Sequence, residues 1–291
     1  MSLNPHYVVI TPVRNEELNI QKTIESFVNQ KILPSLWIVV DDGSKDKTGD
    51  IIDEAAAKYP WITAIHRADR GFRQPGTGVV EAFYDGYPII GATSWDFLVK
   101  FDGDLQFQPD YFESCFARFA QDPQLGIGGG VECYETPAGW VGESLGDPLF
   151  HVRGATKIYR RACWEQIGGL HKAPGWDTLD ELKANMLGWK TCTFRDHKIL
   201  QLKRTGSADG RWRNWVKNGL ANYITGYHPV FMFAKCGRRL WRRPYITGSA
   251  GLTWGYIKGW LTRVPRVPDK ALIKYIQDQQ LRRLTGRKSI W

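Results

Sequence analysis

Two apolar stretches near the start of the chain decide the fold: YVVIT at residues 7–11 and LWIVV at residues 36–40. Each is a continuous run rich in β-branched and aromatic residues, which is typical of a strand buried on both faces of a parallel sheet. Residues 61–65 and 95–101 predict two more strands, and patterns of helical periodicity separate the four. This alternation predicts an α/β fold with a mostly parallel sheet flanked by helices.

Polar segments between the strands predict where the helices begin. We expect Asn15 to cap a helix whose apolar face includes Leu18, and Asp46 to cap the next helix. Pro109 suits the first turn of a further helix. The glycine run at residues 126–130 predicts the entry to a turn and a loop-rich stretch.

The composition excludes several classes of protein. Of the 291 residues, 43% are hydrophobic and 24% are charged, which excludes a disordered or fibrous chain. The five cysteines are scattered and include no C-x-x-C pair, so we expect neither a disulfide framework nor a zinc site. The opening residues lack the pattern of a secretory signal, and no run of 18 apolar residues occurs. These features predict a cytoplasmic protein without a simple membrane-spanning helix.

Charge is divided unevenly along the chain. Residues 1–200 contain 20 Lys and Arg against 27 Asp and Glu, whereas residues 201–291 contain 19 against 3. We therefore predict two parts, a larger α/β domain over residues 1–205 and a basic, aromatic and helical C-terminal region over residues 206–291.

The C-terminal region combines tryptophans and arginines with two apolar stretches, residues 223–234 and 245–261. Its arginines include Arg238, Arg239, Arg242 and Arg243. Trp and Arg beside apolar helices suit the headgroup layer of a membrane, so we predict attachment to an anionic membrane surface. A groove for nucleic acid needs less apolar sequence, and no nucleic-acid partner is expected. The alternative is a helical subdomain that packs on the larger domain with its charges solvated.

Polar and acidic residues follow three of the predicted strands. They are TPVRNEE at 11–17, DDGS at 41–44 and DGDLQ at 102–106. The carboxyl ends of parallel strands meet at one edge of a sheet, where open α/β sheets bind their ligands. The first of these segments contains no glycine, and no G-x-x-x-x-G-K-[ST] run occurs, which argues against dinucleotide and P-loop binding.

The D-G-D segment predicts a metal site. In extended backbone, Asp102 and Asp104 point the same way, and their mutual repulsion is relieved by a cation between them. Oxygen ligands favour Mg²⁺ or Mn²⁺, which commonly complete their coordination with substrate phosphates. We expect Gly103 to leave room for a metal-bound phosphate and Gln106 to add an oxygen from the same face. The alternative is a simple acidic turn.

Five segments in this order resemble the family 2 glycosyltransferases of the GT-A fold. They are VVITPVRNEE (8–17), VVDDGSKDKT (39–48), KFDGDLQF (100–107), GATKIYRRACWEQIGG (154–169) and GWDTLDELKANMLGW (175–189). The resemblance covers roughly the first 205 residues. It implies a GT-A catalytic domain, with a Rossmann-like arrangement of strands and helices, that uses a nucleotide-diphosphate sugar.

The resemblance also implies a set of site residues. It places the base and ribose at the first two strand ends and holds the diphosphate through Mn²⁺ or Mg²⁺ at the D-x-D segment. The metal ligands would be Asp102, Asp104 and Gln106. The residues expected to contact the nucleotide are Thr11, Pro12, Glu16, Asp41, Asp42, Arg73 and Asp102. Arg70 and Arg153 are further candidates for phosphate contacts. One of the two aspartates at 41–42 is also suited to an Asx-turn that caps the next helix.

The general base of the family lies in an E-D pair before a helix. Here Trp176 and Asp177 stand in its place, which makes Asp177 the first candidate for the catalytic base, with Asp180 and Glu181 as rivals. Such a base takes the proton of an acceptor hydroxyl as it attacks the anomeric carbon. The alternative for Asp177 is helix capping. His151 is the one histidine of interest near this segment.

Together these features predict an inverting, metal-dependent glycosyltransferase, peripheral on the cytoplasmic face of the cell membrane. Its acceptor would be a polyprenyl-linked glycan in polysaccharide biosynthesis. Two alternatives stay open. One is a polyprenyl-phosphate sugar synthase, whose acceptor is already an anionic phosphate, and the other is a non-catalytic nucleotide- or nucleic-acid-binding protein.

Overall fold

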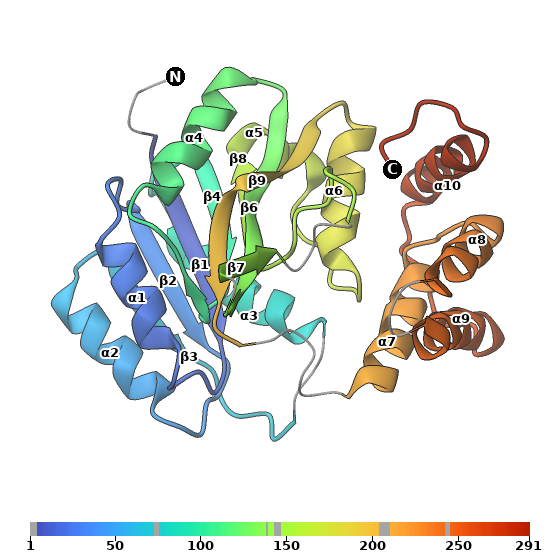
Figure 1. The fold of residues 1–291 in the computed structure, drawn as a ribbon. Helices are drawn as coiled ribbons and strands as arrows, with labels where there is room; N and C mark the ends of the chain where they lie inside the picture. Colours follow the sequence, from blue (N-terminus) through green and yellow to red (C-terminus); the bar gives the residue numbers. More distant parts are fainter. Residues whose placement is uncertain (1–4, 73–75, 138, 143–146, 204–209, 242–244) are drawn as a thin grey trace.

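The computed structural model describes residues 5–72, 76–137, 139–142, 147–203, 210–241 and 245–291. Within them, the strands form one nine-stranded sheet with helices on both faces (Figure 1). The strand order is β3-β2-β1-β4-β8-β6-β9-β5, and β7 pairs with β6. The strands are β1 Tyr7–Val13, β2 Leu36–Asp41, β3 Ile62–His66, β4 Phe97–Phe101, β5 Leu105–Gln106, β6 Leu125–Thr136, β7 Gly139–Gly142, β8 Thr156–Arg160 and β9 Lys190–Gln201. The predicted α/β fold is confirmed.

The first four strands, β3, β2, β1 and β4, run parallel to their neighbours. Their apolar residues supply both faces of the sheet. Along β1, Tyr7 and Val9 join the core on one face, whereas Val8 and Ile10 join the core on the other. All four side chains are fully buried. A strand between two layers of helices needs apolar residues at every position, which explains the unbroken run in the sequence.

Helices cover both faces of the sheet. They are α1 Ile20–Val28, α2 Thr48–Lys58, α3 Gly78–Gly86, α4 Tyr111–Gln121, α5 Arg161–Ile167 and α6 Trp176–Met186, with a 3₁₀ turn at Tyr87–Ile90. The prediction for the start of α1 is wrong: its N-cap is Asn19, and Leu18 is 82% exposed. Asn15 instead adopts a left-handed backbone, and its side chain accepts the Lys45 N–H.

The prediction for Asp46 is closer to the observed structure. Its carboxylate accepts the Thr48 N–H at 3.0 Å, at the first residue of α2. It therefore stabilises the start of the helix from the residue before the N-cap, Lys47.

The glycine run at 126–130 lies in β6, so the predicted turn is wrong. A Cβ on Gly129 would collide with the carbonyl oxygen of Thr156 on β8, and one on Gly130 would collide with the carbonyl oxygen of His197 on β9. The glycines therefore let neighbouring backbones approach closely within a buried strand.

The C-terminal region is helical, as predicted, and its helices gather at one side of the sheet domain, next to α6 (Figure 1). They are α7 Arg211–Ile224, α8 Pro229–Arg239, α9 Tyr245–Leu261 and α10 Lys270–Leu284. Leu179 and Leu182 of α6 share one hydrophobic core with Tyr223, Leu272 and Ile276. The C-terminal region thus packs on the larger domain. The predicted boundary at 205–206 falls outside the described residues and stays a prediction.

One side of α9 is exposed although it is apolar. Leu252 and Tyr256 face the core, whereas Ile246, Trp254, Trp260 and Leu261 are 73%, 49%, 65% and 59% exposed. At about 100° per residue these four fall on one face of the helix, which we call the outer face of α9. None of the helices that the structure describes combines the length and the apolar character needed to cross a membrane.

Candidate active site

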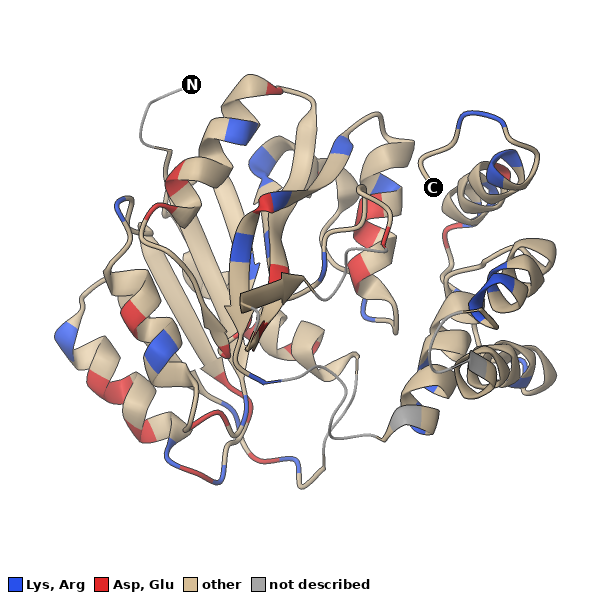
Figure 2. Ribbon diagram, viewed as in Figure 1, with Lys and Arg blue, Asp and Glu red and all other residues tan. Residues whose placement is uncertain are grey.

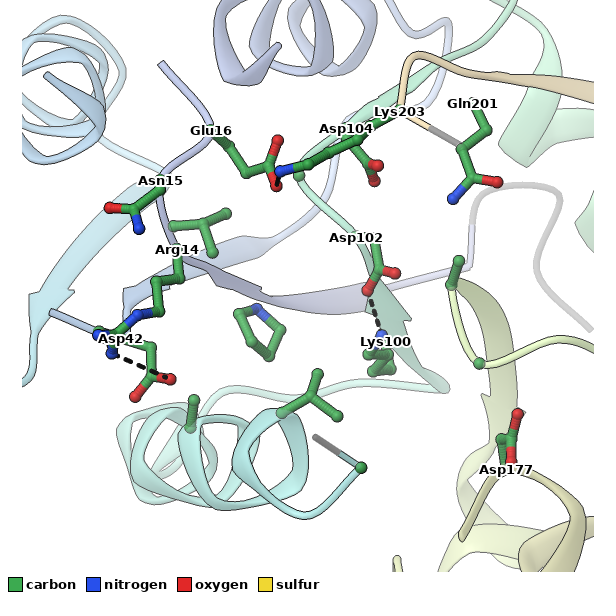
Figure 3. Close-up of a pocket in the computed structure, with 18 of the residues that line it drawn as sticks. Arg14, Asn15, Glu16, Asp42, Lys100, Asp102, Asp104, Asp177, Gln201 and Lys203 are labelled. Carbon is green, nitrogen blue, oxygen red and sulfur yellow. Dashed lines mark hydrogen bonds and ion pairs between the residues drawn. The ribbon is translucent and has the colours of Figure 1, made fainter. Parts of the chain in front are cut away.

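A cavity of about 740 Å³ opens at the carboxyl ends of β1, β2 and β4. Figure 3 shows Asp42 and Arg14 toward one end of it and Asp177 toward the other, with Asp102 between. The predicted site residues that line it are Pro12, Glu16, Arg70, Asp42, Asp102, Asp104, Arg153 and Asp177. Residues predicted from segments far apart in the sequence therefore meet in one cavity. Arg73 lies outside the described residues.

The D-G-D segment forms a tight turn between β4 and β5. The Thr23 hydroxyl lies 2.9 Å from the carbonyl oxygens of both Gly103 and Leu105, and it accepts the Leu105 N–H at 3.1 Å. A Cβ on Gly103 would collide with Val13. The glycine thus makes room for β1 rather than for a phosphate, and the turn, not extended backbone, brings both carboxylates to the cavity.

Four carboxylates gather around this turn, and three of them have a cationic partner. The ion pairs are Glu16–Lys203 at 2.7 Å, Glu132–Arg153 at 3.1 Å and Asp102–Lys100. Among the residues that the structure describes, Asp104 has no ion-pair partner. Burial, followed by the negative charges of Asp102, Glu16 and Glu132, raises the pKa of Asp104 to about 8. An ionised Asp104 is therefore unfavourable in this cavity unless a cation compensates its charge.

The carboxylate oxygens at this turn fit a divalent cation whose remaining ligands come from a phosphate. Within the described part of the chain, no three His, Cys, Asp or Glu side chains are grouped closely enough to hold a metal by themselves. Mg²⁺ and Mn²⁺ are nevertheless commonly held by one or two carboxylates plus substrate phosphates. Asp104, which has no ion-pair partner within the described part of the chain, and Asp102 supply such oxygens.

Gln106 is not placed as predicted. It is exposed, and Gln201 of β9, which pairs with Leu105, lines the cavity instead. The alternation used to predict Gln106 assumed a straight strand, and the turn at Gly103 breaks that alternation.

The two aspartates after β2 have different surroundings. Asp42 lines the cavity and forms ion pairs with Arg67 and Arg70. Asp41 is buried, and its carboxylate accepts the Ser44 N–H at 2.9 Å and lies 3.3 Å from Nδ1 of His66. Asp41 thus holds the loop after β2, and it does not cap α2, which begins at Thr48.

Thr11 is also turned away from the cavity. It is fully buried, and its hydroxyl accepts the indole N–H of Trp37 at 2.8 Å. Its side chain fixes β1 against β2, next to the cavity residue Pro12.

Asp177 lies in the first turn of α6 and lines the cavity. Gly175, with a left-handed φ of 83°, is the N-cap residue, so Asp177 does not hold that position. The Lys157 ammonium donates to the Asp177 carbonyl oxygen, and Trp176 packs against that ammonium. These contacts fix the backbone of Asp177 while its side chain lines the cavity.

The two rivals of Asp177 are buried below it. Asp180 lies 2.7 and 2.9 Å from the Lys157 ammonium, and Glu181 lies 2.8 Å from it. Glu181 also lies 2.9 Å from Nδ1 of His151. Burial raises the pKa of Asp180 despite the Lys157 charge. We call Lys157, Asp180, Glu181 and His151 the α6 ion network. Asp180 and Glu181 are both fully buried, and their ion pairs anchor α6.

Several cavity residues were not predicted from the sequence. They are Arg14, Asn15, Lys45, Lys100, Glu132, Gln201 and Lys203. Glu132 and Gln201 come from β6 and β9, whose places in the sheet depend on long-range pairing that the sequence pattern does not reveal. Lys100 lies within a predicted strand. A lysine in an otherwise apolar run is unusual, because lysines are rarely buried without a partner, and it could have indicated a functional residue.

Comparison with known proteins is consistent with this geometry. The model for glycosyl transferase family 2 matches residues 8–168. Probable glycosyltransferase YdaM of Bacillus subtilis is 38% identical over 63 residues, which cover 21% of this chain and 15% of that protein. Chondroitin synthase of Pasteurella multocida is 24% identical over 121 residues, 42% of this chain and 12% of that protein. The chain thus spans a small part of these relatives.

Solved structures share the fold. Mannosyltransferase PcManGT from Pyrobaculum calidifontis, in complex with GDP-Man and Mn²⁺, has a TM-score of 0.57 at 19% identity and covers 93% of this chain and 79% of its own. TarS of S. aureus, in complex with UDP-GlcNAc, has a TM-score of 0.53 at 14% identity over 95% and 81%. These likenesses show the GT-A fold of glycosyltransferases. Because the family model covers more than half of the 291 residues and the fold agrees, the chain belongs to glycosyl transferase family 2.

Proposed function

We propose that the chain transfers a sugar from a nucleotide-diphosphate donor to an acceptor hydroxyl, with inversion at the anomeric carbon. The observation that carries this proposal is the cavity itself, in which strand-end carboxylates at Asp102 and Asp104 share one space with Asp177 of α6. The neighbours with GDP-Man and UDP-GlcNAc bound support a nucleotide-sugar donor.

The diphosphate of the donor would lie beside the D-G-D turn. Asp104 and Asp102 would hold Mn²⁺ or Mg²⁺ there, and the ion would neutralise the charge that develops on the leaving diphosphate. Lys203 and Arg153, which pair with neighbouring carboxylates, line the same part of the cavity. The nucleotide would extend toward Pro12, Asp42 and the arginines around it.

Asp177 is the proposed general base. The acceptor oxygen attacks the anomeric carbon while its proton passes to the Asp177 carboxylate. The bond from that carbon to the diphosphate oxygen breaks, and the diphosphate leaves with the electron pair. A single displacement from the opposite face inverts the configuration. Asp180 and Glu181 are held in the buried α6 ion network, which favours Asp177 over both.

The substitution Asp177→Asn tests this role. It keeps the shape of the side chain but removes its ability to take a proton, so we expect turnover with a hydroxyl acceptor to fall by about 10²–10⁴-fold. Affinity for the nucleotide diphosphate should stay unchanged, because that contact is made elsewhere. The measurement is a transfer assay with UDP-, GDP- and dTDP-sugars and polyprenyl-linked glycans, with calorimetry of the matching nucleotide. Asp50→Asn, in the exposed first turn of α2, is the matched control.

The alternatives give different results in the same assay. A polyprenyl-phosphate sugar synthase would lose far less activity, because its acceptor is already ionised. A non-catalytic nucleotide-binding protein would bind nucleotide but transfer no sugar with any donor. Unchanged turnover of Asp177→Asn with a hydroxyl acceptor contradicts the proposed base.

We further propose a lipid-linked acceptor and peripheral attachment to the cytoplasmic face of the membrane. Figure 2 shows many Lys and Arg but few acidic residues on α7–α10, and the outer face of α9 adds exposed apolar side chains. Such a combination favours an anionic membrane surface. Arg242 and Arg243 of the predicted basic cluster lie outside the described residues. An enzyme bound there would meet acceptors whose lipid is in the bilayer.

A further inference from the structure

Two buried lysines lie directly opposite each other in the middle of the sheet. Lys100 of β4 pairs in register with Lys157 of β8, and their side chains are 2% and 0% exposed. Their ammonium groups lie 5.4 and 5.7 Å from the centre of the Trp176 ring. Two adjacent cations removed from water are costly unless anions compensate them. The structure therefore requires a source of negative charge for each lysine.

The two lysines are compensated from different directions. Lys157 contacts Asp180 and Glu181 of the buried α6 ion network, at 2.7 and 2.8 Å. Lys100 forms an ion pair with Asp102 and lines the cavity. Lys157 thus faces a permanent pair of buried carboxylates. Lys100 faces a carboxylate at the edge of a space where we place the donor.

The surroundings of Lys100 suit an anionic ligand. An ammonium group has three N–H donors, and the ion pair with Asp102 and the indole of Trp176 fix its position. A cation that is held in place binds a phosphate oxygen strongly, because most of the water around the ammonium group is already removed in the folded protein.

We infer that Lys100 binds the diphosphate of the sugar nucleotide and gives donor binding a component that does not depend on a metal. This inference rests on the proposed function, because it assumes that the donor occupies this cavity. Lys100 would share the neutralisation of the diphosphate with the cation at Asp104.

Calorimetry with UDP, GDP and dTDP tests the inference, each titrated once with Mn²⁺ and once with EDTA. In EDTA, we expect Lys100→Met to weaken binding of the preferred nucleotide by about 10–100-fold, the range for a hydrogen bond to a charged group. With Mn²⁺ present the loss should be smaller, because the metal then contributes most of the neutralisation of the diphosphate. Lys190→Met, which removes an exposed lysine paired with Asp122, is the control for net charge. Thermal unfolding checks that each variant is folded.

A double-mutant cycle separates contact with the donor from simple compensation of Asp102. If Lys100 only neutralises Asp102, then Lys100→Met should cost no affinity once Asp102→Asn has removed that charge. If Lys100 contacts the diphosphate, the loss in EDTA persists in the Asp102→Asn protein. Equal affinity of Asp102→Asn with and without Lys100→Met overturns the inference. Failure of the wild-type protein to bind any of the three nucleotides under either condition instead overturns the proposed function.

Discussion

Asp104 is the residue whose ionised form most needs a cation, because burial and three neighbouring carboxylates raise its pKa. We expect Asp104→Ala to abolish the dependence of nucleotide binding on Mn²⁺ and to lower turnover by about 100-fold or more, since metal stabilisation of developing charge is worth several kcal/mol. Asp102→Ala should also be severe. The measurement is calorimetry with Mn²⁺ and with EDTA beside the transfer assay.

The control for this substitution is Asp110→Ala, which removes an exposed aspartate just before α4. It should leave both the affinity and the turnover unchanged. Wild-type affinity that is the same with Mn²⁺ and with EDTA would show that the D-x-D carboxylates do not hold a metal with the nucleotide.

At the residue scale, the sequence predicts side chains on local turns better than those brought in by distant strands. Asp102, Asp104 and Asp42 follow buried strands, so their place at the carboxyl edge follows from strand direction alone. Gln201 reaches the same edge because β9 pairs with β5, a contact between segments nearly 100 residues apart. The local periodicity of the sequence does not predict the pairing of β5 with β9.

At the scale of elements, α6 depends on a buried charge network that responds to pH. Burial alone would lower the pKa of His151, but the charge and hydrogen bond of Glu181 outweigh it and raise the pKa to about 9. The ordinary value is 6.5. A raised folded pKa means that protonated His151 stabilises the fold fully below about pH 6.5, and that this stabilisation is lost as the pH rises through about 9.

We therefore expect the free energy of unfolding to fall by up to about 3 kcal/mol between pH 6.5 and 9. Urea denaturation across this range measures it. His151→Gln should reduce this dependence and leave the part that Asp104 contributes as it ionises near pH 8, whereas His6→Gln, at an exposed histidine, should keep all of it. A wild-type protein with constant stability over this range would contradict the ion pair between His151 and Glu181.

The elements of the first hundred residues were predictable, because each strand is a dense apolar run and each helix is amphipathic. The strand β6 was not, since five residues that include four glycines look like a turn in any local pattern. Its glycines are explained by the neighbouring backbones of β8 and β9, which only the assembled sheet brings close.

At the scale of the whole molecule, the outer face of α9 and the basic charge around it predict binding to membranes. We expect the wild-type protein to sediment with anionic vesicles of phosphatidylserine and phosphatidylcholine. Salt should weaken this binding without abolishing it, because burial of apolar side chains is not screened. Replacing Ile246, Trp254, Trp260 and Leu261 by serine should leave the protein in the supernatant.

The matched control replaces Leu18 and Leu33, two exposed leucines of the larger domain, by serine and should still sediment. A wild-type protein that remains in the supernatant at low salt would contradict membrane attachment. Deleting α10 is a poorer test, because Leu272 and Ile276 belong to the core shared with α6 and their loss would destabilise the fold.

Because α6 and the C-terminal helices share a core, the C-terminal region cannot be exchanged without affecting the larger domain. In a chimera, the C-terminal region of one family member would replace that of another. Here the replaced helices would include the partners of Leu179 and Leu182, on the same helix that carries Asp177. A chimera joined at the predicted boundary would therefore change the position of the proposed base as well as the proposed membrane attachment. A chimera that preserves turnover should transfer α6 along with α7–α10.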